Sequence, residues 1–292
     1  MHRGVLTCAT ALIALAVASP AISQARDADG LPQGVDWSEA HSGTPLDLSG
    51  FKRTFDDEFD DVRAITPDGG EGPWFAPVHA TAGGATYRPP DYQPSPFSVS
   101  DGVLNIRAEK VNGDWQTGHM QTANSKGEGF SQKYGYFEIR AKMPPDGTMG
   151  AWPAFWLYSN TRYTDKTKTR AEIDIIEYYP GNDPRGYHAA VHLRPGSNAQ
   201  PGEVTKSWWV SGYDRPDKLS DGDWHTYGAK VTPEWIIVYF DRKEVMRVPT
   251  LKEFKTPLYM LVSNSMVTEE VPQAKSPIDL KVDYVRAWSK AR

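Results

Sequence analysis

Short segments of alternating apolar and polar residues make up much of the chain after its first fifty residues. Examples are 97–108, 136–143, 235–248, 258–262 and 280–288, most of them bounded by Gly, Pro, Asn or Asp. A period of two places successive side chains on opposite faces of a β-strand, whereas helical periodicity is almost absent here. The pattern therefore predicts an all-β fold of many short strands, packed as an antiparallel two-sheet sandwich or a jelly roll.

Turn residues divide several of these segments into hairpins. Asp101-Gly102 separates 97–100 from 103–108, and Asp241-Arg242-Lys243 separates two strands within 235–248. Two connections, about 62–96 and about 195–223, are too long for simple turns. Long loops on a sandwich commonly form sites or rims, although tolerated insertions are an equal alternative.

The N-terminus has the pattern of a secretory signal. His2 and Arg3 precede the apolar stretch 12–18, and small residues follow up to Ala25. We expect residues 1–25 to be a signal peptide, 26–50 a loosely attached lead-in and 51–292 one domain, in a secreted or periplasmic protein. An uncleaved N-terminal membrane anchor is the alternative.

Composition narrows the possible chemistry and partners. The only cysteine, Cys8, lies in the predicted signal, so the mature chain has no disulfide and no thiol nucleophile. The net charge is −5 and no basic block occurs, so we expect no nucleic-acid partner and, after signal cleavage, no membrane partner. The 10 Trp, 14 Tyr and 10 Phe suit stacking on sugar rings, although a large β-core also uses them. We expect a monomer.

The segment 171–180, AEIDIIEYYP, reads as a buried strand that carries three acids, Glu172, Asp174 and Glu177. Regular alternation puts the first two on one face and sends Glu177 into the core, where an uncompensated acid costs several kcal/mol. A β-bulge at Ile175-Ile176 would return Glu177 to the face of the other two acids. The spacing therefore predicts a bulge.

Three acids on one patch of a strand permit acid–base chemistry. With the bulge, the glutamate Cα atoms lie roughly 13 Å apart, and inward-leaning side chains close most of that distance. Retaining glycosidases need carboxyl groups separated by about 5–5.5 Å, and mutual repulsion should raise at least one pKa. The alternatives are the solvated face of an amphipathic strand and a calcium site.

Longer motifs surround these acids. Residues 129–144, GFSQKYGYFEIRAKMP, and 150–157, GAWPAFWL, precede AEIDIIEY, and this order resembles the family-16 glycoside hydrolases, which include laminarinases, mixed-linkage β-glucanases, agarases and κ-carrageenases. Similar segments at 55–60, 223–227, 235–248 and 282–286 extend the resemblance over most of the chain. The resemblance implies a concanavalin-like β-jelly roll whose concave sheet forms an open substrate cleft, with 51–292 as the catalytic domain.

The resemblance also implies roles for individual residues. Glu172 would be the nucleophile, Glu177 the general acid/base and Asp174 the residue that tunes the nucleophile. The predicted substrate-binding residues are Trp152, Trp156, His192, Arg140, Trp208 and Asn264, with Trp152 favoured for stacking on a sugar. A structural calcium would be held by Glu58, the backbone of Gly102 and Asp283, unless these are simple surface carboxylates. No catalytic metal or other cofactor is implied.

These features lead to a functional prediction with two alternatives. The prediction is a secreted retaining endo-β-glycanase that hydrolyses β-1,3- or β-1,3-1,4-glucan by double displacement. The first alternative is a hydrolase of a galactan of the agarose or carrageenan type, or of a bacterial exopolysaccharide. Sulfated or carboxylated substrates would favour basic residues in the cleft loops, such as Arg185, Arg194, Lys206 and Arg215. The second alternative is a non-catalytic, lectin-like glycan-binding module.

Overall fold

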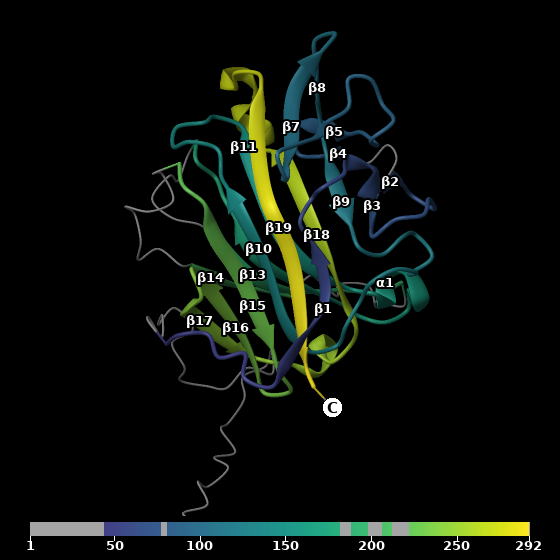
Figure 1. Ribbon diagram of the computed structural model, residues 1–292, viewed down its shortest axis with the longest axis vertical. Coiled ribbons are helices and arrows are strands. Elements are labelled where there is room, and N and C mark those ends of the chain that lie inside the picture. Colours follow the sequence, from purple (N-terminus) through teal and green to yellow (C-terminus); the bar gives the residue numbers. More distant parts are fainter. Residues whose placement is uncertain (1–43, 77–80, 182–187, 198–205, 212–221, 292) are drawn as a thin grey trace, which may run out of the picture. The chain divides into compact units, whose positions relative to one another are not determined.

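The computed structural model describes residues 44–76, 81–181, 188–197, 206–211 and 222–291 of the 292-residue chain. Its strands form two sheets (Figure 1). The larger sheet has the order β17 (Lys243–Pro249), β16 (Trp235–Phe240), β15 (His225–Val231), β10 (Gly135–Lys142), β19 (Ile278–Lys290), β7 (Val103–Val111), β8 (Asp114–Thr117), β5 (Ala85–Tyr87) and β4 (Thr81–Ala82). In addition, β1 (Phe51–Asp57) pairs with β19 and β6 (Phe97–Ser100) with β7.

The smaller sheet carries the acidic segment near its middle. Its order is β14 (Lys206–Ser211), β13 (His188–Arg194), β12 (Arg170–Glu177), β11 (Ala151–Ser159), β18 (Leu258–Met266), β9 (His119–Gln121), β3 (Trp74–Ala76) and β2 (Ile65–Pro67). Helical turns are short: α1 (Thr161–Thr164), η1 (Val62–Ala64), η2 (Lys252–Phe254) and η3 (Thr268–Gln273). The predicted all-β architecture of two sheets is confirmed.

Both predicted hairpins are present. Asp101 and Gly102, between β6 and β7, have φ values of 54° and 72°. Asp241 and Arg242, between β16 and β17, have φ values of 46° and 58°. Two successive residues with positive φ match the twist of the flanking strands, which is why such turns connect hairpins. Asp241 also accepts a hydrogen bond from the Thr226 backbone N–H at 3.0 Å, which ties the second turn to β15.

The end of the predicted lead-in segment is attached to the larger sheet. The Leu46 N–H donates to the Arg242 carbonyl, and the Glu244 N–H donates to the Thr44 carbonyl, both at 2.8 Å. The predicted signal peptide and lead-in residues 26–43 lie outside the described residues. Among the described residues, no helix has the length and apolar character needed to cross a membrane.

Packing between the sheets fixes the orientation of β12 and β18. Ile173, Ile175 and Ile176 of β12 are fully buried. On β18, Asn264 is fully buried, and its side-chain amide donates to the carbonyls of Ile106 (2.9 Å) and Ile278 (3.1 Å), which belong to the other sheet. The opposite face of these strands is therefore free to form a site.

Candidate active site

A β-bulge interrupts β12 between Asp174 and Glu177. On the β11 side, Ile176 lies opposite Phe155 and Asp174 lies opposite Trp156, so Ile175 has no partner of its own. The register with β13 shifts over the same interval. The bulge keeps both isoleucines buried and puts Glu177 on the face of Glu172 and Asp174. The bulge predicted from the acid spacing is confirmed.

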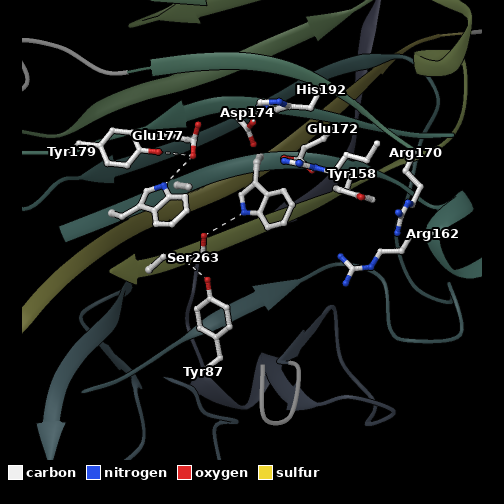
Figure 2. A pocket seen from close by; sticks show the side chains of 15 residues that line it. Tyr87, Tyr158, Arg162, Arg170, Glu172, Asp174, Glu177, Tyr179, His192 and Ser263 are labelled. Atoms are coloured by element: carbon white, nitrogen blue, oxygen red, sulfur yellow. Dashed lines mark hydrogen bonds and ion pairs between the residues drawn. The ribbon is translucent and has the colours of Figure 1, made fainter. Parts of the chain in front are cut away.

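The three acids line one cavity of about 740 Å³ on the smaller sheet (Figure 2). Aromatic residues and arginines make up much of the remaining wall. The lining residues are Tyr87, Trp152, Ala154, Trp156, Tyr158, Arg162, Arg170, Glu172, Asp174, Glu177, Tyr179, His192, Arg194, Ser263 and Ser265. Flat apolar rings beside convergent carboxylates suit a carbohydrate.

Glu172 forms an ion pair with an arginine from the neighbouring strand. Nε and Nη2 of Arg194 donate to the two Glu172 carboxylate oxygens at 2.5 Å each. His192 lies opposite Glu172 in the β12–β13 ladder, so Arg194, two residues further on, projects from the same face. The bidentate contact stabilises the negative charge of Glu172, a residue that is buried as a whole.

Asp174 pairs with His192 at the middle of the acidic cluster. The His192 Nε2 atom lies 2.9 Å from the Asp174 carboxylate, and both side chains are buried. Burial raises the pKa of Asp174 to about 7, and Glu177 and Glu172 add to that rise, while the hydrogen bond with His192 opposes it. Burial lowers the pKa of His192, but the hydrogen bond to Asp174 and the negative charges of Asp174 and Glu172 together raise it overall. The pair can therefore hold a proton near neutral pH.

Glu177 receives two hydrogen bonds from the aromatic end of the cavity. The Trp152 indole N–H donates to Oε1 at 3.0 Å, and the Tyr179 hydroxyl donates to the same oxygen at 2.9 Å. The two rings pack together with their centroids 5.7 Å apart. Burial and the neighbouring Glu177 charge raise the pKa of Tyr179, so its hydroxyl remains a donor. These contacts fix the orientation of the Glu177 carboxyl group.

Trp156 of β11 and two serines of β18 also line the cavity. The Trp156 indole N–H donates to the Ser263 hydroxyl at 3.3 Å, and Ser265 shares a 2.5 Å hydrogen bond with the Tyr87 hydroxyl. Trp152 and Trp156 are both half-buried and line the cavity, as expected. Which indole stacks on a sugar stays a prediction.

The sequence prediction was wrong about Asn264. This residue lies between the sheets and binds backbone carbonyls instead of facing the cavity. Its neighbours Ser263 and Ser265 face the cavity because side chains alternate along β18. Trp208 lies opposite Val191 in the pairing of β14 with β13, but its side chain is outside the described residues, as are Arg185 and Arg215.

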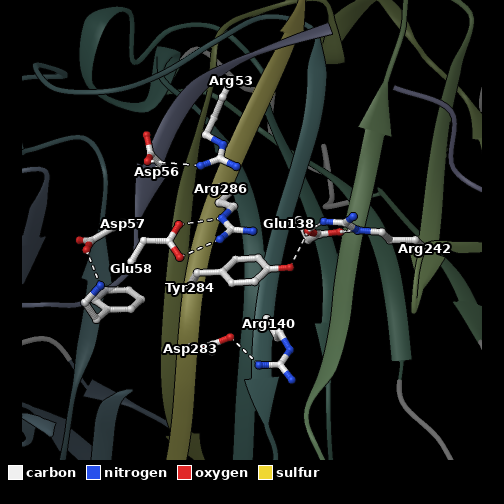
Figure 3. A network of polar contacts seen from close by, with 11 residues as sticks. Arg53, Asp56, Asp57, Glu58, Glu138, Arg140, Arg242, Asp283, Tyr284 and Arg286 are labelled. Carbon is white, nitrogen blue, oxygen red and sulfur yellow. Dashed lines mark hydrogen bonds and ion pairs between the residues drawn. The ribbon is translucent and has the colours of Figure 1, made fainter. Parts of the chain in front are cut away.

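The prediction that Arg140 binds substrate was also wrong. Arg140 lies on β10 of the larger sheet and donates to Asp283 at 2.5 Å (Figure 3). Its guanidinium lies 5.3 Å from the Trp224 ring centroid. Phe137, Ile139 and Ala141 are fully or almost fully buried, so alternation puts Arg140 on the opposite face of β10. It does not line the cavity.

The residues predicted to hold calcium are engaged with arginines. The Glu58 carboxylate accepts two hydrogen bonds from Arg286 at 2.7 Å each, and Asp283 accepts the bond from Arg140 (Figure 3). The position of a Cβ on Gly102 lies 3.9 Å from the Glu58 carbonyl oxygen, so these two positions are near one another. As placed, these side chains do not fit a calcium ion, because each carboxylate already has a cationic partner.

The acidic cluster itself has the donor atoms of a metal site. Ligand atoms of Glu172, Asp174 and His192 lie within 4.8 Å of one another. Arg194 and the Asp174–His192 hydrogen bond already compensate these charges, so the geometry is explained without an ion.

The family model for glycosyl hydrolases family 16 matches residues 90–286, which include the acidic strand and most of the cavity wall. The chain belongs to this family. The family model covers all three acids on the bulged strand, as the resemblance implied.

Two curated relatives are similar over most of this chain. The endo-1,3-1,4-beta-glycanase EglC of Rhizobium meliloti (strain 1021) is 35 % identical over 271 residues, and ExsH of the same organism, with the same description, is 33 % identical over 271 residues. Each match covers 84 % of this chain and 53 % of the relative. The chain therefore spans about half the length of these relatives.

Solved structures support the fold. SCLam, described as a non-specific endo-beta-1,3(4)-glucanase of this family, matches with a TM-score of 0.65 at 21 % identity, over 88 % of this chain and 98 % of that chain. The laminarinase catalytic domain of Thermotoga maritima MSB8 matches with a TM-score of 0.59 at 19 % identity, over 83 % and 99 %. The family-16 jelly roll is thus the fold of this chain.

Proposed function

We propose that this chain is a retaining endo-β-glycanase that hydrolyses β-1,3- or β-1,3-1,4-glucan. The observation that carries the proposal is the placement of Glu172, Asp174 and Glu177 on one face of the bulged strand, in a cavity walled by aromatic rings. The β-glucanase activities for which EglC, ExsH and SCLam are named support the β-glucan substrate.

In the first step, Glu172 attacks the anomeric carbon of the sugar while Glu177 gives its proton to the departing glycosidic oxygen. The carbon–oxygen bond of the substrate breaks, and a glycosyl ester forms on Glu172. Arg194 orients Glu172, and one of its two hydrogen bonds must break as that carboxylate oxygen becomes bonded to carbon. Trp152 and Tyr179 hold Glu177 for the proton transfer.

In the second step, Glu177 takes a proton from water, and the resulting hydroxide attacks the same carbon from the opposite face to release Glu172. Two inversions give net retention. The Asp174–His192 pair lies beside Glu172, and its proton compensates charge that changes on the nucleophile during the cycle.

Product analysis on laminarin, lichenan and barley mixed-linkage glucan tests the proposal. We expect internal cleavage, seen as a rapid fall in viscosity, and β-configured reducing ends in the first NMR spectra. Glu172→Gln should lower kcat by at least about 10³-fold. Glu177→Ala should be rescued by azide, giving a β-glycosyl azide, because azide needs no general base. An α-configured first product, or undiminished activity of Glu172→Gln, would contradict the mechanism.

We also propose that the chain is exported and processed after about Ala25. The charged start, the short apolar stretch and the small residues before that position support this. Mass spectrometry of protein recovered from the periplasm and the medium tests the cleavage, with an uncleaved membrane-bound chain as the contrary result.

A further inference from the structure

The three arginines of the cavity differ in their partners. Arg194 is bound to Glu172, whereas Arg162 and Arg170 have no carboxylate partner among the described residues. Figure 2 shows the latter two beyond Glu172 and Tyr158, at the end of the cavity away from Glu177. Arg170 is two residues before Glu172 on β12, and Arg162 belongs to the short helix α1.

Neutral groups position both of these guanidinium groups. Arg170 Nη2 donates to the Pro195 carbonyl at 2.6 Å, while its buried Nε has no hydrogen-bond partner. Arg162 is exposed and lies over the Tyr158 ring, 5.4 Å from the centroid. Burial raises the pKa of Tyr158 and the nearby Glu172 charge adds to that rise, whereas the charges of Arg170, Arg162 and Arg194 oppose it.

The charges of the cavity are separated along its length. Glu172 is compensated by Arg194 and Asp174 by His192, which leaves two positive charges at the Arg162–Arg170 end. Enclosing uncompensated guanidinium groups under a neutral sugar costs hydration free energy without a matching gain. A carboxylate or sulfate would instead accept charge-assisted, bidentate hydrogen bonds.

We infer that Arg162 and Arg170 form a subsite for an anionic substituent, a carboxylate or a sulfate ester, on the sugar unit bound beside Glu172. This inference rests on the proposed hydrolysis of a β-glycan and narrows its substrate class. The chain as a whole carries a net charge of −5, so general attraction of a polyanion does not account for such a preference. The local pair Arg162 and Arg170 would account for a preference for an anionic substrate.

Three forms of one backbone test the subsite. Barley mixed-linkage glucan is used unmodified, oxidised at a minority of C6 positions to carboxylates, and sulfated to the same extent. Initial rates at several concentrations give kcat and KM for the wild type, Arg162→Gln and Arg170→Gln. Lys168→Gln is the matched control, because Lys168 lies in the same loop, pairs with Asp165 and does not line the cavity. Melting curves establish that each variant is folded.

We expect the wild type to have a kcat/KM about tenfold or more higher on an anionic form than on the neutral glucan, chiefly through KM. Each arginine variant should reduce that ratio severalfold, Lys168→Gln should leave it unchanged, and added salt should raise KM only for the anionic forms. The carboxylated and sulfated arms show which anion is preferred. Equal kcat/KM on all three forms, unaffected by either arginine variant, would overturn the subsite and leave the proposed hydrolase intact. If none of the three glucan forms released any product, even after prolonged incubation, the proposed function itself would be refuted.

Because Arg170 is half-buried, loss of its side chain could disturb β12. Arg162 is exposed, so Arg162→Gln is a second, independent variant, and the double variant with Arg170→Gln can be compared with each single variant. If Arg162→Gln melts like the wild type and still keeps the full preference for the anionic forms, the subsite is refuted.

Discussion

Arg194 on β13 and Glu172 on β12 make a two-point ion pair, with both nitrogen–oxygen distances at 2.5 Å. The contact crosses from one strand to its neighbour, and the Glu172 side chain is only 9 % exposed, whereas that of Arg194 is 37 % exposed. The acid that we propose as nucleophile therefore enters the reaction with its charge compensated and its rotation restricted. That arrangement makes Arg194 a positioning residue.

Removal of Arg194 should cost stability as well as activity. Arg194→Met leaves the buried Glu172 charge unpaired, and we expect a loss of about 1–3 kcal/mol in the free energy of unfolding, reduced from a fully buried pair by the exposure of Arg194. In the double variant with Glu172→Gln, much of that loss should be restored. Urea unfolding of the four proteins measures the coupling. Additive losses would show that the pair contributes nothing.

The two donors to Glu177 should affect turnover more than binding. Trp152→Phe and Tyr179→Phe keep an aromatic ring in the wall but remove one hydrogen bond each to Oε1. We expect kcat to fall by about 3- to 30-fold for each, with a larger combined fall, because the carboxyl group loses its fixed orientation. Steady-state kinetics on mixed-linkage glucan is the measurement. A rise in KM alone would mean that these residues serve only to bind sugar.

Asp174 should make stability depend on pH in the opposite direction from an ordinary surface acid. Its pKa rises from 3.8 to about 7 on folding, so the native state binds more protons and loses stability as pH rises from about 4 to 7. The raised pKa of His192 acts in the same direction. Asp174→Asn removes the titrating acid, so its melting temperature relative to wild type should increase by at least about 3 °C between pH 4.5 and 8.

Thermal unfolding at closely spaced pH values measures this difference in melting temperature. His225 and Asp241 form a second histidine–aspartate pair, which lies outside the cavity. Asp241→Asn serves as a control for general pH effects. A melting difference for Asp174→Asn that stays constant over this range would show that Asp174 ionises normally in the folded protein.

Asn264 should matter for folding and not for substrate. Asn264→Ala removes two hydrogen bonds that join β18 to the opposite sheet, and we expect a loss of about 2–4 kcal/mol in the free energy of unfolding. Ser265→Ala changes the neighbouring side chain on the cavity face. KM should change for Ser265→Ala and stay within about twofold for Asn264→Ala. Guanidinium denaturation and kinetics together separate the two roles.

The sequence was sufficient where a physical conflict had one simple resolution. An acid at Glu177 in regular alternation would have been buried in the core, so the bulge followed from the spacing alone, and the structure has it at that place. The turn residues Asp101-Gly102 and Asp241-Arg242 likewise located two hairpins, and the structure has positive φ at all four. In both cases, the bulge and the turns, the conformation is decided by interactions among a few residues that are close in sequence.

Residues whose role depends on distant partners were not predictable in the same way. Asn264 was assigned to the cavity although alternation alone cannot say which face of β18 meets the other sheet. Arg140 was assigned to substrate, but its place is fixed by Asp283, far away in sequence. Arg162 and Arg170 lie in or beside a Lys/Arg-rich loop whose composition does not show which side chains turn into the cavity.

The bulge in β12 also has a consequence for how this protein can change over time. Before Ile175, side chains at even-numbered positions face the cavity, and after it those at odd-numbered positions do. Glu172 and Asp174 therefore lie on one side of this change of alternation and Glu177 on the other. Insertion or deletion of one residue anywhere between Glu172 and Glu177 would exchange an acid for an isoleucine in the core. The number of residues between the two glutamates is thus constrained more strictly than the identity of those residues, and the strand can tolerate substitution while remaining closed to changes in length.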